Sequence, residues 1–347
     1  MLSSLRLKKV LALLYILLCI YHLCLNDLEF TKTPCLKLFS LSGYILQRIL
    51  SLELHSNIDM MEHSAYHRYN TYREPLIMVI PFTSGQIERV LHMLSLFERV
   101  PPCRPQGRPV RHLPTVLFYY HASLETHFGK WIQQNISQVW NALPISIRDC
   151  FSYDILWKSA NLTGIRDLYS KWDSEAYSAG TNNMFYGIMR DCSITRKYQY
   201  MFYCEPDVSP IRSGWLDKLV ELSLLSDQHK VWMIGSVYMG HDFGAVISWA
   251  LQYTRTAWKH LNGNALYRLG DASFLRYLYY VEKKYYPFSF DMSIYRYFHS
   301  LRNPNLAHKF VRTNVIINIG NSYVTNTSIQ ETYSDTYLVH GKHIILD

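Results

Sequence analysis

The 347-residue sequence is poor in charge and in cysteine. Only 18% of its residues are charged and 49% are apolar, which excludes an intrinsically disordered chain. Its seven cysteines are too few and too scattered for a small disulfide scaffold, and the absence of a C-x-x-C pair argues against a cysteine-ligated zinc site. The net charge of +8 is spread thinly, with no Lys/Arg block beyond residue 9. We therefore expect a globular protein that does not bind nucleic acid.

The amino terminus carries an uncharged apolar run, residues 10–25, behind the basic residues Arg6, Lys8 and Lys9. As a helix this run would span roughly 24 Å, which suits a thin early-secretory membrane. A cleaved signal peptide is the alternative, but no small-x-small cleavage site follows Cys24. We predict a cytoplasmic tail (1–9), a signal-anchor helix (10–25) and a lumenal remainder, hence a single-pass type II protein of the Golgi or endoplasmic reticulum membrane.

Sites for lumenal modification are consistent with that topology. The triplets that begin at Asn135, Asn161 and Asn326 are acceptors for N-glycosylation, although such triplets are also common by chance. The predicted lumenal part has an odd number of cysteines, so that it can form at most two disulfides: Cys35, Cys103, Cys150, Cys192 and Cys204.

Beyond a stem over residues 26–74, the pattern changes to alternating strands and helices. Residues 76–80 and 115–120 are short apolar runs typical of buried parallel strands, and amphipathic helical segments follow them from Thr83 and around 131–140. This alternation predicts that residues 75–347 form one three-layer α/β/α domain with a mostly parallel central sheet.

The chemically most informative segment begins at residue 198. Residues 198–204 are almost wholly apolar or aromatic, as in a central strand, and Glu205-Pro-Asp207 follows directly. In doubly wound α/β domains ligands bind at the carboxyl ends of the strands, and oxygen ligands are those that Mg²⁺ and Mn²⁺ prefer. An acidic turn without function is the simpler alternative.

The anchor, the stem and a strand that ends in Glu-Pro-Asp together resemble a type II membrane glycosyltransferase of the GT-A fold. The triplet resembles that family's Asp-x-Asp motif, with Glu205 in place of the first Asp. The resemblance implies a nucleotide-diphosphate sugar donor, a glycan or glycoprotein acceptor, and Mn²⁺ or Mg²⁺ held by Asp207. It also implies that His340, near the carboxyl end, completes the metal site, and that Glu205 contacts the cation or the donor sugar.

Further segments that resemble donor-binding elements of the family add candidate residues. They follow the first strand (Pro81, Thr83), begin a helix (Asn182, Asn183), form a turn (Asn262, Gly263, Asn264) and end the chain (Lys342). The Asn, Thr and Gly residues among them have a structural alternative, because Asn and Thr cap helices and Asn-Gly favours turns.

Asp291 is the candidate catalytic residue. It lies among the aromatic residues of segment 286–295, which we expect to raise the pKa of its carboxyl group, as suits a general base. The alternative is a helix N-cap.

Two other functions remain open. A membrane-anchored sugar- or nucleotide-binding protein with a degenerate transferase domain would have a similar sequence. A metal-dependent phosphodiesterase is less favoured, because it would need more clustered His and Asp ligands.

Overall fold

A computed structural model describes residues 73–104, 113–152, 155–169, 179–237, 260–301 and 303–345. The predicted tail, anchor and stem up to residue 72 lie outside the described residues, and so does most of the loop that contains Arg108 and Arg111. Within the described ranges, no helix is both long and apolar enough to cross a membrane.

The described residues contain a mixed sheet with the strand order β3-β2-β1-β4-β7-β6-β8. Strands β1, β2, β3 and β4 pair in parallel, β7 runs antiparallel to β4 and β6, and β8 is parallel to β6. The strands are β1 (Glu74–Phe82), β2 (Thr115–Tyr120), β3 (Leu156–Ser159), β4 (Tyr198–Tyr203), β6 (Met233–Gly235), β7 (Ala265–Arg268) and β8 (Phe310–Arg312). The predicted mixed α/β fold with a mostly parallel central sheet is confirmed.

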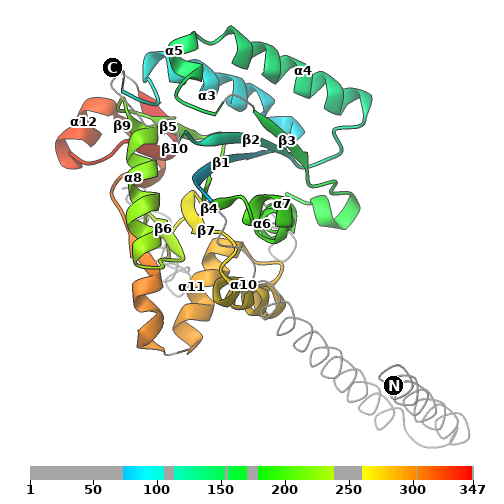
Figure 1. Cartoon of the computed structure of the whole chain (residues 1–347), viewed down its shortest axis with the longest axis vertical. Helices are drawn as coiled ribbons and strands as arrows, with labels where there is room; N and C mark the ends of the chain where they lie inside the picture. Colours follow the sequence, from blue (N-terminus) through cyan, green and yellow to red (C-terminus); the bar gives the residue numbers. More distant parts are fainter. Residues whose placement is uncertain are drawn as a thin grey trace, which may run out of the picture. The chain divides into compact units, whose positions relative to one another are not determined.

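Helices cover both faces of this sheet (Figure 1). One face packs against α3 (Ile87–Arg99), α4 (His127–Ala142), α5 (Ile145–Arg148) and α8 (Trp215–Gln228). The other packs against α6 (Ala179–Arg190), α7 (Cys192–Thr195), α10 (Ala272–Tyr285) and α11 (Phe290–Leu301). The remaining helical elements are α12 (Asn326–Thr332) and the 3₁₀ turns η1 (Ser84–Gln86), η3 (Gly164–Asp167) and η5 (Pro304–Lys309).

The alternation of side chains along β1 explains the two hydrophobic cores. Leu76, Met78 and Ile80 face α3 and α8, whereas Ile77 and Val79 face α6 and its neighbours. Because successive strand residues point to opposite faces, an uninterrupted apolar run indicates a strand that is buried on both sides. The predicted strands at 76–80 and 115–120 are therefore confirmed, the first extended to nine residues and the second with the predicted bounds.

A second, three-stranded sheet lies beside the carboxyl end of β4. Its central strand β10 (Leu338–Ile345) pairs in parallel with β9 (Ile316–Thr325) and antiparallel with β5 (Val208–Pro210). Pairing with β5 and β9 holds β10 in place. This pairing also brings the segment after Asp207 next to His340.

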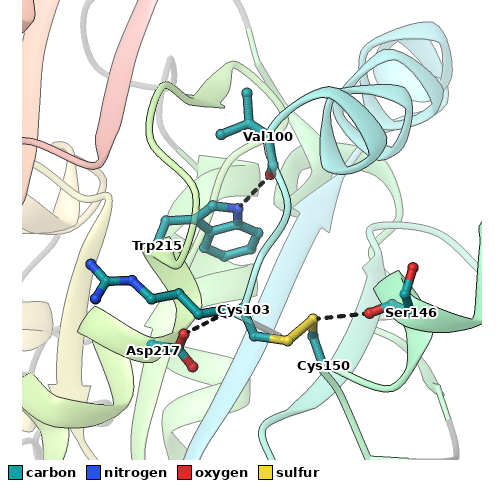
Figure 2. The surroundings of a disulfide bond; sticks show 7 residues. Val100, Cys103, Ser146, Cys150, Trp215 and Asp217 are labelled. Carbon is teal, nitrogen blue, oxygen red and sulfur yellow. Dashed lines mark hydrogen bonds between the residues drawn. A yellow bond between two sulfur atoms is a disulfide. The ribbon is translucent and has the colours of Figure 1, made fainter. Parts of the chain in front are cut away.

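A disulfide links the segment after α3 to the segment after α5. Cys103, after α3, bonds to Cys150, after α5, across 47 positions of sequence (Figure 2). Next to it the indole Nε1 of Trp215 donates to the carbonyl oxygen of Val100 at 3.2 Å. Cys192 is exposed and Cys204 is buried, and both are free thiols, while Cys35 lies outside the described residues.

Candidate active site

The candidate site begins where β4 ends. Glu205 and Asp207 follow this buried strand with Pro206 between them, and β5 starts at the next residue, Val208. In the antiparallel pairing of β5 and β10, His340 stands opposite Val208. The amide nitrogen of Gly341 lies 3.4 Å from the carbonyl oxygen of Asp207, so that the main chain of the triplet is joined to that of β10 next to His340.

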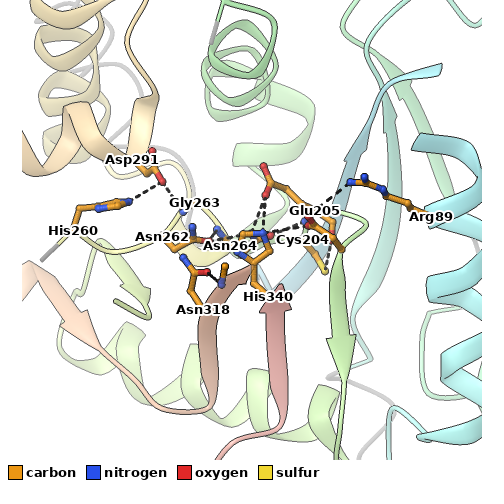
Figure 3. A network of polar contacts seen from close by, with 12 residues as sticks. Arg89, Cys204, Glu205, His260, Asn262, Gly263, Asn264, Asp291, Asn318 and His340 are labelled. Carbon is orange, nitrogen blue, oxygen red and sulfur yellow. Dashed lines mark hydrogen bonds and ion pairs between the residues drawn. The ribbon is translucent and has the colours of Figure 1, made fainter. Parts of the chain in front are cut away.

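This register gathers three side chains that can ligate a cation, of which Glu205 and His340 are labelled in Figure 3. Potential ligand atoms of Glu205, Asp207 and His340 all lie within 4.8 Å of one another. His340 Nε2 is 3.3 Å from Asp207 Oδ1 and 3.6 Å from Glu205 Oε2. The set fits Mn²⁺ or Mg²⁺, because two carboxylates supply hard oxygen ligands and one imidazole supplies a borderline nitrogen.

The charges of the three groups depend on one another. Burial and the charge of Asp207 raise the pKa of Glu205. For Asp207 burial acts in the same direction, but the hydrogen bond and charge of His340 outweigh it and lower the pKa. For His340 burial acts to lower the pKa, yet its contacts with Asp207 and Glu205 raise it. Two acidic groups this close repel each other, and a cation between them would relieve that repulsion.

A positively charged side chain on α3, that of Arg89, also reaches these three groups. Arg89 Nη1 lies 3.9 Å from Asp207 Oδ2, and about half of its side chain is exposed. Arg89 is not among the site residues predicted from the sequence. Its only sequence signal is its position, near the start of the helix that follows the first strand.

The turn Asn262–Asn264 packs directly against Glu205. Asn264 Oδ1 accepts from the amide nitrogen of Glu205 at 2.7 Å, and Asn264 Nδ2 donates to Glu205 Oε2 at 2.9 Å. Asn262 Oδ1 accepts from both Asn264 N and Asn264 Nδ2 at 3.0 Å. The structure thus brings two predicted donor-binding residues, Asn262 and Asn264, to the predicted metal ligands.

Asp291 lies on the other side of this turn, in the first turn of α11. Its Oδ2 accepts from Gly263 N at 3.1 Å and lies 3.3 Å from His260 Nε2. Its Oδ1 accepts from Met292 N at 2.8 Å and also from the hydroxyl of Ser289.

The expectation that the aromatic surroundings raise the pKa of Asp291 is wrong. Burial does act in that direction, but the charge of His260 and hydrogen bonds from His260, Ser289 and Met292 lower the pKa to about 2. A carboxylate with this pKa is a weak base, which counts against general-base catalysis. The catalytic role of Asp291 stays a prediction.

The other predicted donor-binding residues have partners within the protein. Pro81 is buried in β1, and Gln86 Oε1 accepts from both the amide and the hydroxyl of Thr83 at 3.0 and 3.2 Å. Asn182 Nδ2 donates to the carbonyl oxygens of Pro287 and Phe288 at 2.9 and 2.7 Å, and Asn183 Nδ2 donates to that of Arg166 at 2.9 Å.

The last of these residues, Lys342, lies in β10 two positions after His340, and its side chain is outside the described part of the chain. Whether Pro81, Thr83, Asn182, Asn183 or Lys342 contacts a donor therefore stays a prediction.

Comparison with known proteins finds no matching family model and no matching curated protein. Several solved structures are similar. Mouse xyloside xylosyltransferase 1 aligns over 77% of this chain and 97% of its own, with 10% identity and a TM-score of 0.44. Galactosyltransferase LgtC, in complex with donor and acceptor sugar analogs, aligns over 76% and 86%, with 12% identity and a TM-score of 0.41.

Core-mannan synthase A from Aspergillus fumigatus, in its Mn/GDP form, aligns over 72% of this chain and 75% of its own, with 9% identity and a TM-score of 0.39.

Proposed function

We propose that this protein is a GT-A type glycosyltransferase that moves a sugar from a nucleotide-diphosphate donor to a glycan or glycoprotein acceptor, with the help of Mn²⁺ or Mg²⁺. The observation that carries the proposal is the convergence of Glu205, Asp207 and His340 within 4.8 Å at the carboxyl end of a central strand. That end of an α/β sheet is where such folds bind nucleotides.

The residues of the site suit the transfer of a group that leaves as a diphosphate. Asp207, with its lowered pKa, is the main anionic ligand, and His340 and Glu205 lie beside it. When bound, the cation neutralises negative charge that develops on the departing diphosphate. Arg89, 3.9 Å from Asp207 and half exposed, could add positive charge to the same region.

The proposal is tested with purified protein and a panel of nucleotide sugars. We expect release of nucleoside diphosphate from at least one donor with Mn²⁺, and none with EDTA or after Asp207→Asn. Metal-dependent nucleotide binding without turnover would instead identify a degenerate, sugar- or nucleotide-binding domain. Cleavage of phosphodiesters without release of a sugar would identify a phosphodiesterase.

We further propose that residues 10–25 anchor the protein in the Golgi or endoplasmic reticulum membrane, with residues 26–347 in the lumen. Among the three glycosylation triplets, Asn161 is the best acceptor, because it is exposed in the loop after β3, whereas Asn135 lies inside α4 and Asn326 is half-buried at the start of α12. Protease added to sealed microsomes should leave residues 26–347 intact, and an endoglycosidase should reduce the mass. Complete digestion without detergent would overturn this topology.

A further inference from the structure

We propose that Asn264 is a positioning residue that holds the Glu205 carboxylate in the orientation needed for cation binding, and that Asp291 supports it by fixing the turn on which it lies. The inference rests on the proposed function, because it concerns the same cation site. It assigns a supporting role to Asn264 and Asp291, whose hydrogen bonds are made to other residues of the protein.

Asn264 holds Glu205 at two points. One amide group accepts from the main chain of Glu205 at 2.7 Å and donates to its Oε2 at 2.9 Å, so both ends of the glutamate are fixed by the same side chain. Asn264 is only 1% exposed, so water has little access to its amide. A glutamate side chain has several rotatable bonds, and holding it still before a ligand arrives removes an entropic cost from binding.

The amide is also the right chemical group for this task. It is neutral, so it orients the carboxylate without replacing the positive charge that a cation brings. An arginine or lysine at this position would neutralise Glu205 and compete with the cation. Outer partners that orient metal ligands in this way commonly change metal affinity by about 10- to 100-fold when removed.

Hydrogen bonds to Asn262 and Gly263 fix the turn that carries Asn264. Gly263 N donates to Asp291 Oδ2 at 3.1 Å, and the carbonyl oxygen of Gly263 accepts from the buried hydroxyl of Tyr267 at 2.9 Å. Asn262 N donates to the carbonyl oxygen of Ser236 at 2.8 Å. A side chain at Gly263 would lie 2.9 Å from the ring of Phe290, so the close approach of the turn to α11 requires glycine here.

Asp291 is therefore suited to anchoring rather than to proton transfer. Its two oxygens contact four groups that are fixed by the fold, and one of them, Gly263 N, belongs to the turn. Figure 3 shows the resulting order of contacts from His260 through Asp291 and the turn to Glu205 and His340.

A double-mutant cycle tests whether Asn264 acts through Glu205. The full-length protein, Asn264→Ala, Glu205→Ala and the double variant are titrated with Mn²⁺, and free Mn²⁺ is followed by electron paramagnetic resonance. We expect Asn264→Ala to raise the Kd for Mn²⁺ on the order of tenfold in the otherwise unaltered protein and to have little effect in the Glu205→Ala background.

Two further variants guard against a general loss of structure. Asn262→Ala removes the acceptor that orients the amide of Asn264, and we expect a smaller rise in Kd that also depends on Glu205. Asn303→Ala is the matched control, because Asn303 Oδ1 likewise accepts from the main chain two residues on, at 3.0 Å, but belongs to a different loop. It should leave the Kd unchanged.

The outcomes separate this inference from the proposed function. An unchanged Kd after Asn264→Ala, or an equal rise with and without Glu205, would overturn the inference while the cation site stands. A protein that binds no Mn²⁺ at all would overturn the cation site and the inference together.

Discussion

Two pairs of histidine and carboxylate lie in one network of contacts, and they differ in how fully the carboxylate is satisfied. Asp291, paired with His260, also receives hydrogen bonds from two main-chain amides and from Ser289. Asp207, paired with His340 at 3.3 Å, has beyond it only Arg89 at 3.9 Å among the described cations, and stands beside a second carboxylate, Glu205.

The difference indicates that fixed hydrogen-bond donors, more than burial, distinguish Asp291 from the two carboxylates that we propose as cation ligands. Two main-chain amides donate hydrogen bonds to Asp291. The pKa of its carboxyl group is lowered to about 2, so that it is ionised at neutral pH. Glu205 and Asp207 place two acidic groups close together, and burial and the charge of Asp207 raise the pKa of Glu205 despite the nearby His340. That is costly without a cation and favourable with one.

The largest expected effect comes from removing the charge of Asp207. Asp207→Asn keeps the shape of the side chain but loses the negative charge that holds the cation, so we expect the transfer rate to fall on the order of a hundredfold or more while the protein stays folded. Activity is followed as nucleoside diphosphate release, and folding by circular dichroism. Near-normal activity with an unchanged metal requirement would remove Asp207 from the site.

At Asp291 we expect a loss of stability instead. The lowered pKa means that the ionised form stabilises the fold above about pH 4, and that this contribution is lost as the pH falls towards 2. Asp291→Asn should therefore lower the free energy of unfolding by about 2 kcal/mol near neutral pH, with a difference that shrinks below about pH 4. Denaturant unfolding at several pH values measures it, and a pH-independent difference would contradict the anchoring role.

His340→Ala should have an intermediate effect that excess metal can reverse. Its imidazole is one of three ligands and favours Mn²⁺ over the harder Mg²⁺, so the Mn²⁺ concentration for half-maximal activity should rise on the order of tenfold. Turnover at saturating Mn²⁺ should recover. If the Mn²⁺ titration does not move, His340 serves the second sheet only.

Glu205→Gln should have the smallest effect of the four. A glutamine can still accept the hydrogen bond from Asn264 Nδ2 and offer an oxygen to the cation, so we expect the Mn²⁺ affinity to fall by less than about tenfold. The readout is the titration with free Mn²⁺. A loss as large as that of Asp207→Asn would make the two carboxylates equal ligands.

The sequence predicted three strands of the main sheet, β1, β2 and β4, and the position of the acidic triplet, because both depend on local patterns. Residues 115–120 are uniformly apolar or aromatic apart from Thr115, and Glu205-Pro-Asp207 follows such a run directly. His340 was identified by resemblance to a family and not by spacing. What joins it to Asp207 is the pairing of β5 with β10, two segments far apart in the chain.

The electrostatics of Asp291 could not be predicted in the same way. Its aromatic neighbours are visible in the sequence, but the groups that lower its pKa include His260, which lies on a distant loop. The second sheet was also missed, because β5 has only three residues and one of them is proline. In both cases the deciding contacts are non-local.

The central claim is that Glu205, Asp207 and His340 hold the cation and that Asp291 and His260 do not. Crystals of the protein soaked with MnCl₂ and a nucleoside diphosphate, measured near the manganese absorption edge, test it directly. We predict one anomalous peak within ligand distance of Asp207 and His340, lost in Asp207→Asn. A peak at the Asp291–His260 pair, or no peak at the carboxyl end of β4, would contradict it.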